Sequence, residues 1–121
     1  MANYVDVYLV PLPEANIKAY AALAARSGKI FRKHGALSYC EYIASDLNVE
    51  GIVPFPDVVK LQPGETLVYA AVEFESEEVR NEAMKKIMAD PELMEGMSES
   101  DKKLFDYKKM VYGGFKILVE A

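Results

Sequence analysis

Four short segments of the chain alternate apolar and polar residues, at about positions 4–10, 36–44, 66–74 and 109–119. Successive residues of a strand point to opposite faces of a sheet, so alternation with a period of two predicts strands. In each segment one set of alternate residues carries tyrosines and a charged side chain, while the other set is mostly aliphatic. The four segments therefore predict one sheet with two unlike faces.

The aliphatic set suits a cover of helices, and the tyrosine set forms the face where we expect the functional site. A tyrosine ring is apolar and its hydroxyl is polar, so this face is too apolar for bulk water and too polar for ordinary core. On the aliphatic set we place Val5, Val7, Leu9, Val68, Ala70, Val72, Phe74, Val111, Phe115 and Ile117. On the tyrosine set we place Tyr4, Asp6, Tyr8, Tyr39, Glu41, Tyr69, Glu73, Tyr112 and Lys116.

Two segments between the strands, at about positions 14–34 and 77–89, repeat apolar residues at helical spacing. Gly35 suits the C-terminal cap of the first helix, and Ser76 followed by two glutamates suits the N-terminal end of the second. The stretch 45–65 contains three prolines and two glycines and predicts a long loop. Loops of this length are usually functional, so we expect Phe55 to edge the ligand site or a dimer seam.

The order of these elements, βαββαβ, predicts an α+β fold of the ferredoxin-like kind, an antiparallel sheet with both helices on one face. The 121 residues, of which 51% are hydrophobic, predict a single domain over residues 1–121. The face opposite the helices has no cover within the chain. Because monomers seldom expose a large apolar patch, we expect a homodimer whose sheets face each other in a dimeric α/β barrel.

Composition and charge exclude several classes of partner. A formal net charge of −5 argues against non-specific nucleic-acid binding. No apolar run approaches the roughly 20 residues that span a bilayer. Met1–Val10 lacks the basic start of a secretory signal, so we expect a cytoplasmic protein without a membrane partner. The single cysteine cannot form a disulfide within the chain, and one cysteine with one histidine cannot form a usual zinc site. We therefore expect no metal or other cofactor.

Several motifs distributed along nearly the whole chain carry a resemblance. They are Tyr4-Val5-Asp6, His34-Gly35-Ala36-Leu37 leading to Glu41 and Asp46, Val79-Arg80 leading to Met88-Ala89-Asp90-Pro91, and Met110-Val111-Tyr112-Gly113-Gly114-Phe115. Together they resemble the YbaA-type family of small bacterial proteins, whose function is unknown. The resemblance implies the dimeric α/β-barrel superfamily, whose members include cofactor-independent oxygenases, isomerases and stress-related proteins. The haem-ligand arrangements of some members have no obvious counterpart here, because the chain has no tryptophan and a single histidine.

The carboxylates of the tyrosine set, Asp6, Glu41 and Glu73, are the candidate catalytic residues. If a partner covers their face, each has to be paired, hydrogen-bonded or protonated. Neighbouring acids raise one another's pKa and suit proton transfer. In the structural alternative, tyrosine hydroxyls and Lys116 satisfy the acids and fix the dimer register. Both interpretations stay open, because the sequence does not determine the strand register.

Two further residues have simpler explanations than chemistry. His34 precedes a capping glycine at the end of the first helix, where a cation is favoured by the helix dipole. Cys40 shares the aliphatic set with Ala36 and Ser38, which predicts a buried, inert thiol.

Two functions fit these residues. In the first, the protein binds a small, mainly apolar molecule between the tyrosine face and its partner. In the second, it is a cofactor-independent enzyme, oxygenase- or isomerase-like, with a carboxylate base and tyrosine hydrogen-bond donors. No nucleophile–base pair is recognisable, which favours binding, but the sequence leaves the presence of catalysis undecided. The candidate ligand-binding residues are Tyr4, Tyr8, Tyr39, Tyr69, Tyr112, Lys116 and Phe55.

Overall fold

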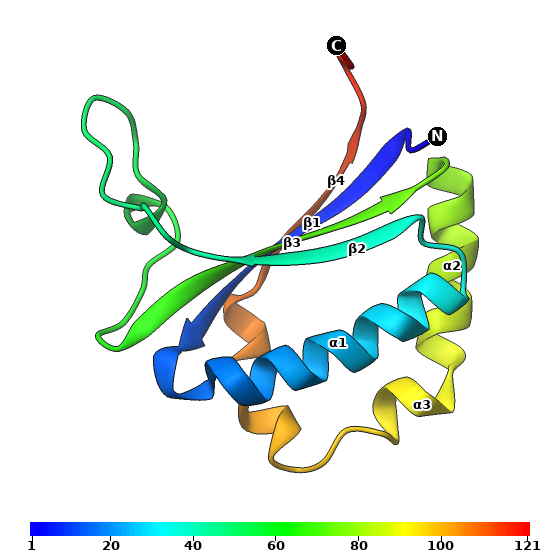
Figure 1. The fold of residues 1–121 in the computed structure, drawn as a ribbon, viewed down its shortest axis with the longest axis horizontal. Helices are drawn as coiled ribbons and strands as arrows, with labels where there is room; N and C mark the ends of the chain where they lie inside the picture. Colours follow the sequence, from blue (N-terminus) through cyan, green and yellow to red (C-terminus); the bar gives the residue numbers. More distant parts are fainter.

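The computed structural model describes residues 1–121 and contains one four-stranded antiparallel sheet in the order β2-β3-β1-β4 (Figure 1). The helices cover one face of this sheet, which confirms the predicted ferredoxin-like architecture. The strands are β1 (Tyr4–Pro13), β2 (Ser38–Ile43), β3 (Glu65–Phe74) and β4 (Val111–Lys116). The helices are α1 (Ile17–Lys33), α2 (Glu77–Ala89) and α3 (Pro91–Met94), with 3-10 turns η1 (Glu14–Asn16), η2 (Phe55–Asp57), η3 (Asp101–Lys103) and η4 (Tyr107–Lys109).

The pairing of β1 with its neighbours assigns the faces of the sheet. Asp6 lies opposite Val72 of β3, and Tyr8 lies opposite Ala70 of β3 and Tyr112 of β4. Opposed residues in an antiparallel pair share a face. Val72 and Ala70 are buried beneath the helices, so the tyrosines and the aspartate of β1 lie beneath the helices too.

The expected face assignment is therefore right for β3 and wrong for the other three strands. Tyr4, Asp6, Tyr8, Tyr39, Glu41, Tyr112 and Lys116 lie on the helix-covered face, and only Tyr69 and Glu73 of the tyrosine set lie on the opposite face. The physical reason is that tyrosine rings fill core space as well as aliphatic chains do, provided that their hydroxyls find partners. The open face, as we call the uncovered side, consists of Val5, Val7, Leu9, Cys40, Tyr42, Tyr69, Ala71, Glu73, Val111 and Phe115.

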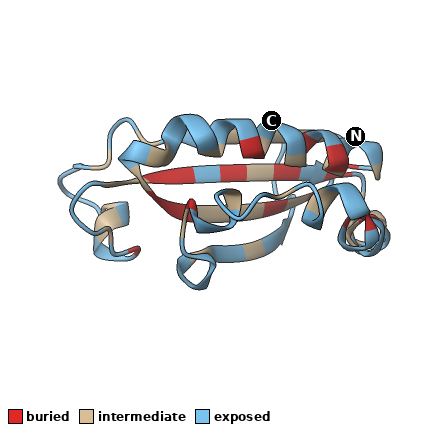
Figure 2. Ribbon diagram, turned by 90° about the horizontal axis from the view of Figure 1, so that it is seen from below, coloured by how far each residue is buried: buried red, intermediate tan, exposed pale blue.

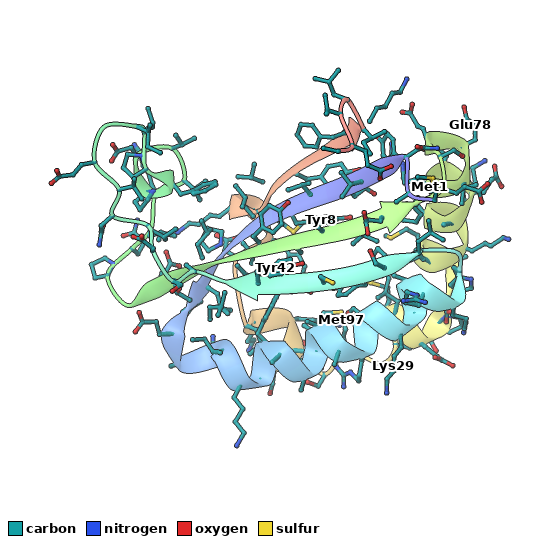
Figure 3. The ribbon with its side chains drawn as sticks, turned by 45° about the horizontal axis from the view of Figure 1, so that its top comes forward. Met1, Tyr8, Lys29, Tyr42, Glu78 and Met97 are labelled. Carbon is teal, nitrogen blue, oxygen red and sulfur yellow. The ribbon has the colours of Figure 1, made fainter.

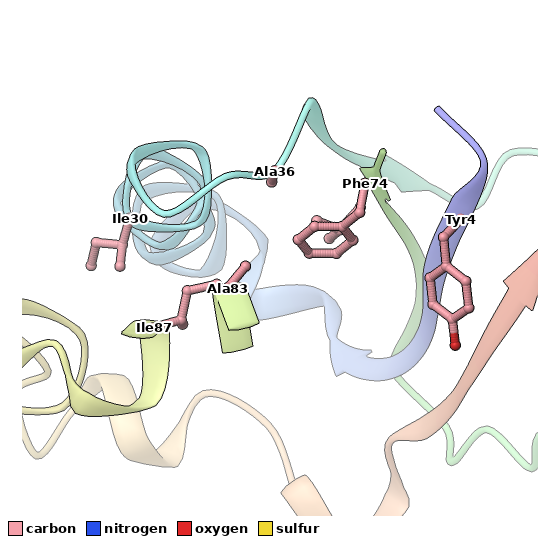
Figure 4. Packing of buried hydrophobic residues seen from close by; sticks show 7 residues of the cluster. Tyr4, Ile30, Ala36, Phe74, Ala83 and Ile87 are labelled. Atoms are coloured by element: carbon pink, nitrogen blue, oxygen red, sulfur yellow. The ribbon is translucent and has the colours of Figure 1, made fainter. Parts of the chain in front are cut away.

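The main core cluster joins the sheet to α1 and α2. Phe74 and Ile87 are fully buried and pack with Tyr4 and Ile30 (Figure 4). Figure 2 shows buried positions gathered along the strands, whereas much of the helical surface is exposed. Cys40, expected to be buried, is exposed on the open face because it shares the parity of Tyr42.

β1 continues to Pro13, three residues beyond the predicted range of about 4–10. Even-numbered residues in this register bond toward β3, as the hydrogen bond of 2.8 Å from Glu14 N to Gly64 O shows, so odd-numbered residues of β1 bond toward β4. The pairing of β1 with β4 extends only as far as Leu9, which lies opposite Val111, the first residue of β4. The missing N–H groups of Pro11 and Pro13 therefore face an unpaired edge, where they cost no ladder hydrogen bond.

Several local predictions are confirmed. Gly35 adopts a φ of 120° directly after α1, and the Ser76 hydroxyl accepts a hydrogen bond of 3.1 Å from Val79 N at the start of α2. Gly114 is required by a close approach, because a Cβ there would collide with the Tyr4 hydroxyl. The loop before β3 projects on the side of the sheet away from α1 (Figures 1 and 3).

Asp90 ties the end of α1 to the start of α3. Its carboxylate accepts a hydrogen bond of 2.9 Å from Glu92 N and lies 2.9 Å from Lys33 Nζ and 2.7 Å from His34 Nε2. The hydrogen bond from Lys33, followed by that from His34, holds the pKa of Asp90 well below its ordinary value of 3.8. His34, the C-cap residue, thus also links two elements through its ring.

We expect Asp90→Asn to lower the melting temperature at neutral pH. Because the folded-state pKa is depressed, Asp90 contributes stability that is present above pH 3.8 and is lost as the pH falls through the folded pKa. The difference from wild type in thermal melts should therefore shrink below pH 3.8. Asp57→Asn, at an exposed residue of η2 without an ion pair, is the control. A difference that is the same at all pH values would contradict the assignment.

Candidate functional site

The site is built around an apolar cavity of about 330 Å³ between the sheet and the helices, which we call the inner cavity. Sixteen of its 18 lining residues are hydrophobic, a composition typical of ligand pockets. They come from all three helices, from β1, β2 and β3, and from the segment between α3 and β4. The lining residues are Tyr8, Val10, Tyr20, Leu23, Ala24, Ser27, Phe31, Tyr39, Glu41, Ala70, Met84, Met88, Leu93, Met94, Met97, Phe105, Tyr107 and Met110.

Methionines dominate one wall of this cavity. Five of the six methionines of the chain line it, and the sixth is Met1. Methionine is unbranched and polarisable, so it adapts its shape to what it contacts and packs favourably on aromatic rings. The wall can therefore adjust to an apolar or aromatic ligand.

The one charged group of the inner cavity is Glu41, held between two tyrosines. The Tyr20 hydroxyl from α1 donates to Oε1 of Glu41, and the Tyr39 hydroxyl from β2 donates to Oε2. Burial, reinforced by the carboxylate, raises the pKa of both hydroxyls above the ordinary value of 10.0. Both tyrosines therefore stay protonated donors at neutral pH, and the carboxylate is left as the hydrogen-bond acceptor of the site.

Gly28 of α1 makes this arrangement possible. A Cβ at position 28 would lie 2.8 Å from Cδ1 of Tyr39. The missing side chain lets α1 approach the tyrosine ring, and Phe31 packs on the same ring with centroids 5.3 Å apart. Glycine in the middle of a helix costs up to about 1 kcal/mol, and here close packing explains it.

Tyr8 supplies a second polar group to the inner cavity. Its hydroxyl makes no hydrogen bond within the chain, while its ring lies 4.9 Å from that of Tyr112. Burial, followed by the charge of Asp6, raises the Tyr8 pKa, and Glu41 contributes in the same direction. The free hydroxyl is available to a bound molecule.

A wider groove of about 670 Å³ runs between α1 and the edge strand β2, and we call it the outer groove. It shares Tyr20, Ala24, Tyr39 and Glu41 with the inner cavity, so these residues form the partition between the two spaces. The lining residues are Leu12, Ile17, Tyr20, Ala21, Ala24, Ala25, Gly28, Lys29, Arg32, Tyr39, Glu41, Tyr42, Ile43 and Val68.

Asp6 belongs to a separate group, the Asp6 cluster, formed with Tyr4, Arg80 and Tyr112. Asp6 is 0% exposed, and its Oδ1 accepts hydrogen bonds of 2.9 Å from Arg80 Nη1 and from the Tyr112 hydroxyl. Oδ2 of Asp6 has no partner. Burial raises the pKa of Asp6, against the opposing effects of the Tyr112 hydrogen bond and the Arg80 charge. Arg80 also donates to the Tyr4 hydroxyl at 2.9 Å and lies over its ring, so the cluster joins α2 to β1 and β4.

No three His, Cys, Asp or Glu side chains are placed to hold a metal ion together. No helix combines the length and the apolar character that crossing a membrane requires.

Comparison with known proteins gives the family. A family described as "protein of unknown function (DUF1428)" matches residues 3–107. The chain belongs to the DUF1428 family. It is 36% identical over 118 residues to the uncharacterised protein YbaA of Escherichia coli strain K12, covering 98% of each chain. This relative confirms the resemblance that the motifs carry.

Solved structures with the same fold are more distant from this DUF1428 chain. A dimeric ferredoxin-like protein from an uncultured marine organism has a TM-score of 0.60 at 10% identity, covering 100% of this chain and 92% of that one. SnoaB, a cofactor-independent oxygenase from Streptomyces nogalater, has a TM-score of 0.59 at 12% identity, covering 99% and 97%. At these identities the likeness shows the fold.

The candidate residues of this DUF1428 chain separate into three places. Glu41 lies in the inner cavity with Tyr8 and Tyr39, and Asp6 lies in its cluster with Tyr4 and Tyr112. Since β3 runs between β1 and β2, the two acids make separate contacts. The remaining candidates lie elsewhere. Glu73 accepts a hydrogen bond of 2.7 Å from Ser38 Oγ on the open face, where Tyr69 also packs on Tyr42. Lys116 lies 3.8 Å from Glu77, and Phe55 is 49% exposed in the loop before β3.

Three features of the site were not predicted. Tyr20 falls on the apolar stripe of α1 by its helical spacing, and its contact with Glu41 depends on how the helix packs on β2. Arg80 appeared only as part of a family motif. The methionines did carry a signal: four of the six occur between positions 84 and 97, a concentration typical of an adaptable wall.

Proposed function

We propose that the protein binds a small, mainly apolar molecule in the inner cavity, with Glu41, Tyr20 and Tyr39 at its polar end. The observation that carries this proposal is a single carboxylate, held by two tyrosine hydroxyls, in an otherwise apolar space. Pockets that bind organic molecules combine apolar walls with a few fixed polar groups. The inner cavity therefore replaces the tyrosine face toward a partner as the candidate binding site.

The polar end favours a ligand with a hydroxyl donor. Each carboxylate oxygen of Glu41 accepts one tyrosine hydrogen bond and retains capacity for another. The free Tyr8 hydroxyl, near enough for Glu41 to raise its pKa, offers a second contact. A phenol or an enol on an aromatic body matches these groups and the methionine wall.

The variant Glu41→Gln tests this proposal with two ligands. 1-Naphthol has a hydroxyl donor, and 1-methoxynaphthalene is the matched compound that has none. Hydrogen bonds to charged groups contribute about 1.5–3 kcal/mol, so we expect naphthol affinity to fall roughly 10- to 100-fold in calorimetry. Glu73→Gln, which changes a carboxylate on the open face, should leave affinity unchanged. Equal naphthol affinity in wild type and Glu41→Gln would remove the proposal. Native mass spectrometry of freshly purified protein should also show a retained small molecule.

A cofactor-independent enzyme, oxygenase- or isomerase-like, is the second candidate. In this function Glu41 would take the hydroxyl proton of the substrate, and the protonated Tyr8 and Tyr39 would donate to the resulting oxyanion. The support is the same polar end, together with the fold shared with SnoaB. Consumption of oxygen or isomerisation of a phenol or enol by wild type, lost in Glu41→Gln, would distinguish catalysis from binding.

The protein is also proposed to form a homodimer through the open face. Phe115 is 56% exposed and Tyr69 is 40% exposed there, beside the aliphatic side chains of β1. Such a surface on a sheet is suited to a second identical copy related by a two-fold axis. The loop between β2 and β3, which contains Phe55, rises on the same side of the sheet, and this supports a place for the loop at the dimer seam (Figure 1).

A further inference from the structure

The outer groove has apolar walls and a charged rim. Ile17, Ile43 and Val68 are among its ten hydrophobic lining residues, and its volume of about 670 Å³ exceeds that of the inner cavity. Lys29 and Arg32 are its only cations. Lys29 of α1 and Tyr42 of the neighbouring strand β2 both line this groove (Figure 3).

Neither of these two cations has an acidic partner. On the same helix, Arg26 lies 2.8 Å from Asp101 and Lys33 lies 2.9 Å from Asp90, whereas Lys29 and Arg32 make no ion pair. Their spacing of three residues places the two side chains next to each other on one side of α1. The pair thus offers two adjacent positive charges at the edge of an apolar groove, in a chain whose formal net charge is −5.

Two negative features of the groove are weaker than this pair. Glu41 in the partition contributes at most one negative charge, shared over two oxygens that accept hydrogen bonds from Tyr20 and Tyr39. The C-terminal end of α1 carries a partial charge of only about −0.5, against two full positive charges. An anionic group at the rim is therefore attracted, and an apolar tail attached to it has a wall to contact.

We propose that the outer groove binds an amphiphilic carboxylate, with its apolar chain between α1 and β2 and its head group between Lys29 and Arg32. Arginine matches a carboxylate with two parallel N–H donors, and lysine adds a point charge beside it. This second site does not depend on a ligand in the inner cavity.

Decanoate and 1-decanol, compared by calorimetry below their aggregation concentrations, test the proposal. Wild type should bind decanoate at least about tenfold more tightly than decanol, and the difference should fall with added sodium chloride. Lys29→Gln/Arg32→Gln should abolish the difference, because the two ligands then meet the same apolar wall without charge. Ala25→Trp, which fills the groove at an exposed position, should weaken both ligands.

The control variant removes the same number of positive charges at positions outside the outer groove. Lys18→Gln/Lys86→Gln removes two exposed, unpaired cations that lie outside the groove, and decanoate affinity should stay within about twofold of wild type. Equal affinity for decanoate and decanol in wild type, or an equal loss in both double variants, would overturn the proposal. Binding of 1-naphthol by wild type is measured alongside. In wild type, naphthol binding without decanoate selectivity refutes only the groove proposal, and decanoate selectivity without naphthol binding refutes only the inner-cavity proposal.

Discussion

Arg80→Met is expected to destabilise the protein by about 3–5 kcal/mol, the usual cost of removing one partner from a buried ion pair. The reason is Asp6, which is 0% exposed and relies on Arg80 and Tyr112 for the hydrogen bonds of its Oδ1. Its Oδ2 is already without a partner. Without Arg80 the carboxylate would remain buried with only the Tyr112 hydroxyl. Urea unfolding of wild type and variant gives the free-energy difference directly.

Two companion variants separate charge burial from loss of packing. Lys85→Met, on the exposed side of the same helix, should change stability by less than about 0.5 kcal/mol. Asp6→Asn/Arg80→Met should be more stable than Arg80→Met alone, since the double variant buries no charge. A loss under about 1 kcal/mol in Arg80→Met, or no recovery in the double variant, would mean that the Asp6 cluster is not a buried ion pair in solution.

Tyr69→Asp is expected to convert the proposed homodimer to monomers. Tyr69 lies on the open face of β3, where it packs on Tyr42 with ring centroids 5.7 Å apart. Aromatic residues near the centre of an interface contribute about 2 kcal/mol or more, and an unpaired buried carboxylate adds a desolvation cost. Dimerisation should therefore weaken by at least about 30-fold, measured by sedimentation at micromolar concentration.

The matched control is Tyr112→Phe. Tyr112 lies on the helix-covered face opposite Tyr8, so the loss of its hydroxyl should leave association unchanged while it weakens the Asp6 cluster. A wild-type chain that sediments as a monomer at micromolar concentration would end the dimer proposal. An equal effect of both variants on association would show that the dimer uses another surface.

Local chemistry made much of the fold predictable from the sequence. Helical and strand periodicity gave the element order, and Ser76 and Gly35 marked helix ends through interactions that involve neighbouring residues alone. The face of β3 was also predictable, because Val68, Val72 and Phe74 are all strongly apolar and alternate with a set that contains Tyr69 and Glu73. Such a strand has one stable orientation.

The faces of β1 and β2 were not predictable in the same way. Tyr4 and Tyr8 alternate with Val5 and Val7, and either set can be buried when tyrosine hydroxyls find partners. The choice depends on Arg80, which comes from α2 and satisfies Tyr4 and Asp6. It is a long-range contact without a sequence signal of its own. The site shares this dependence, since Glu41 is fixed by Tyr20 from another element.

The concentration of methionines in the inner cavity makes this wall sensitive to oxidation. A thioether that becomes a sulfoxide turns from apolar and flexible to polar and chiral. Because five of the six methionines share one space, oxidation of their thioethers would make that wall polar. The same concentration makes a methionine-methyl NMR spectrum almost entirely a spectrum of the cavity, in which each resonance except that of Met1 reports on its contents.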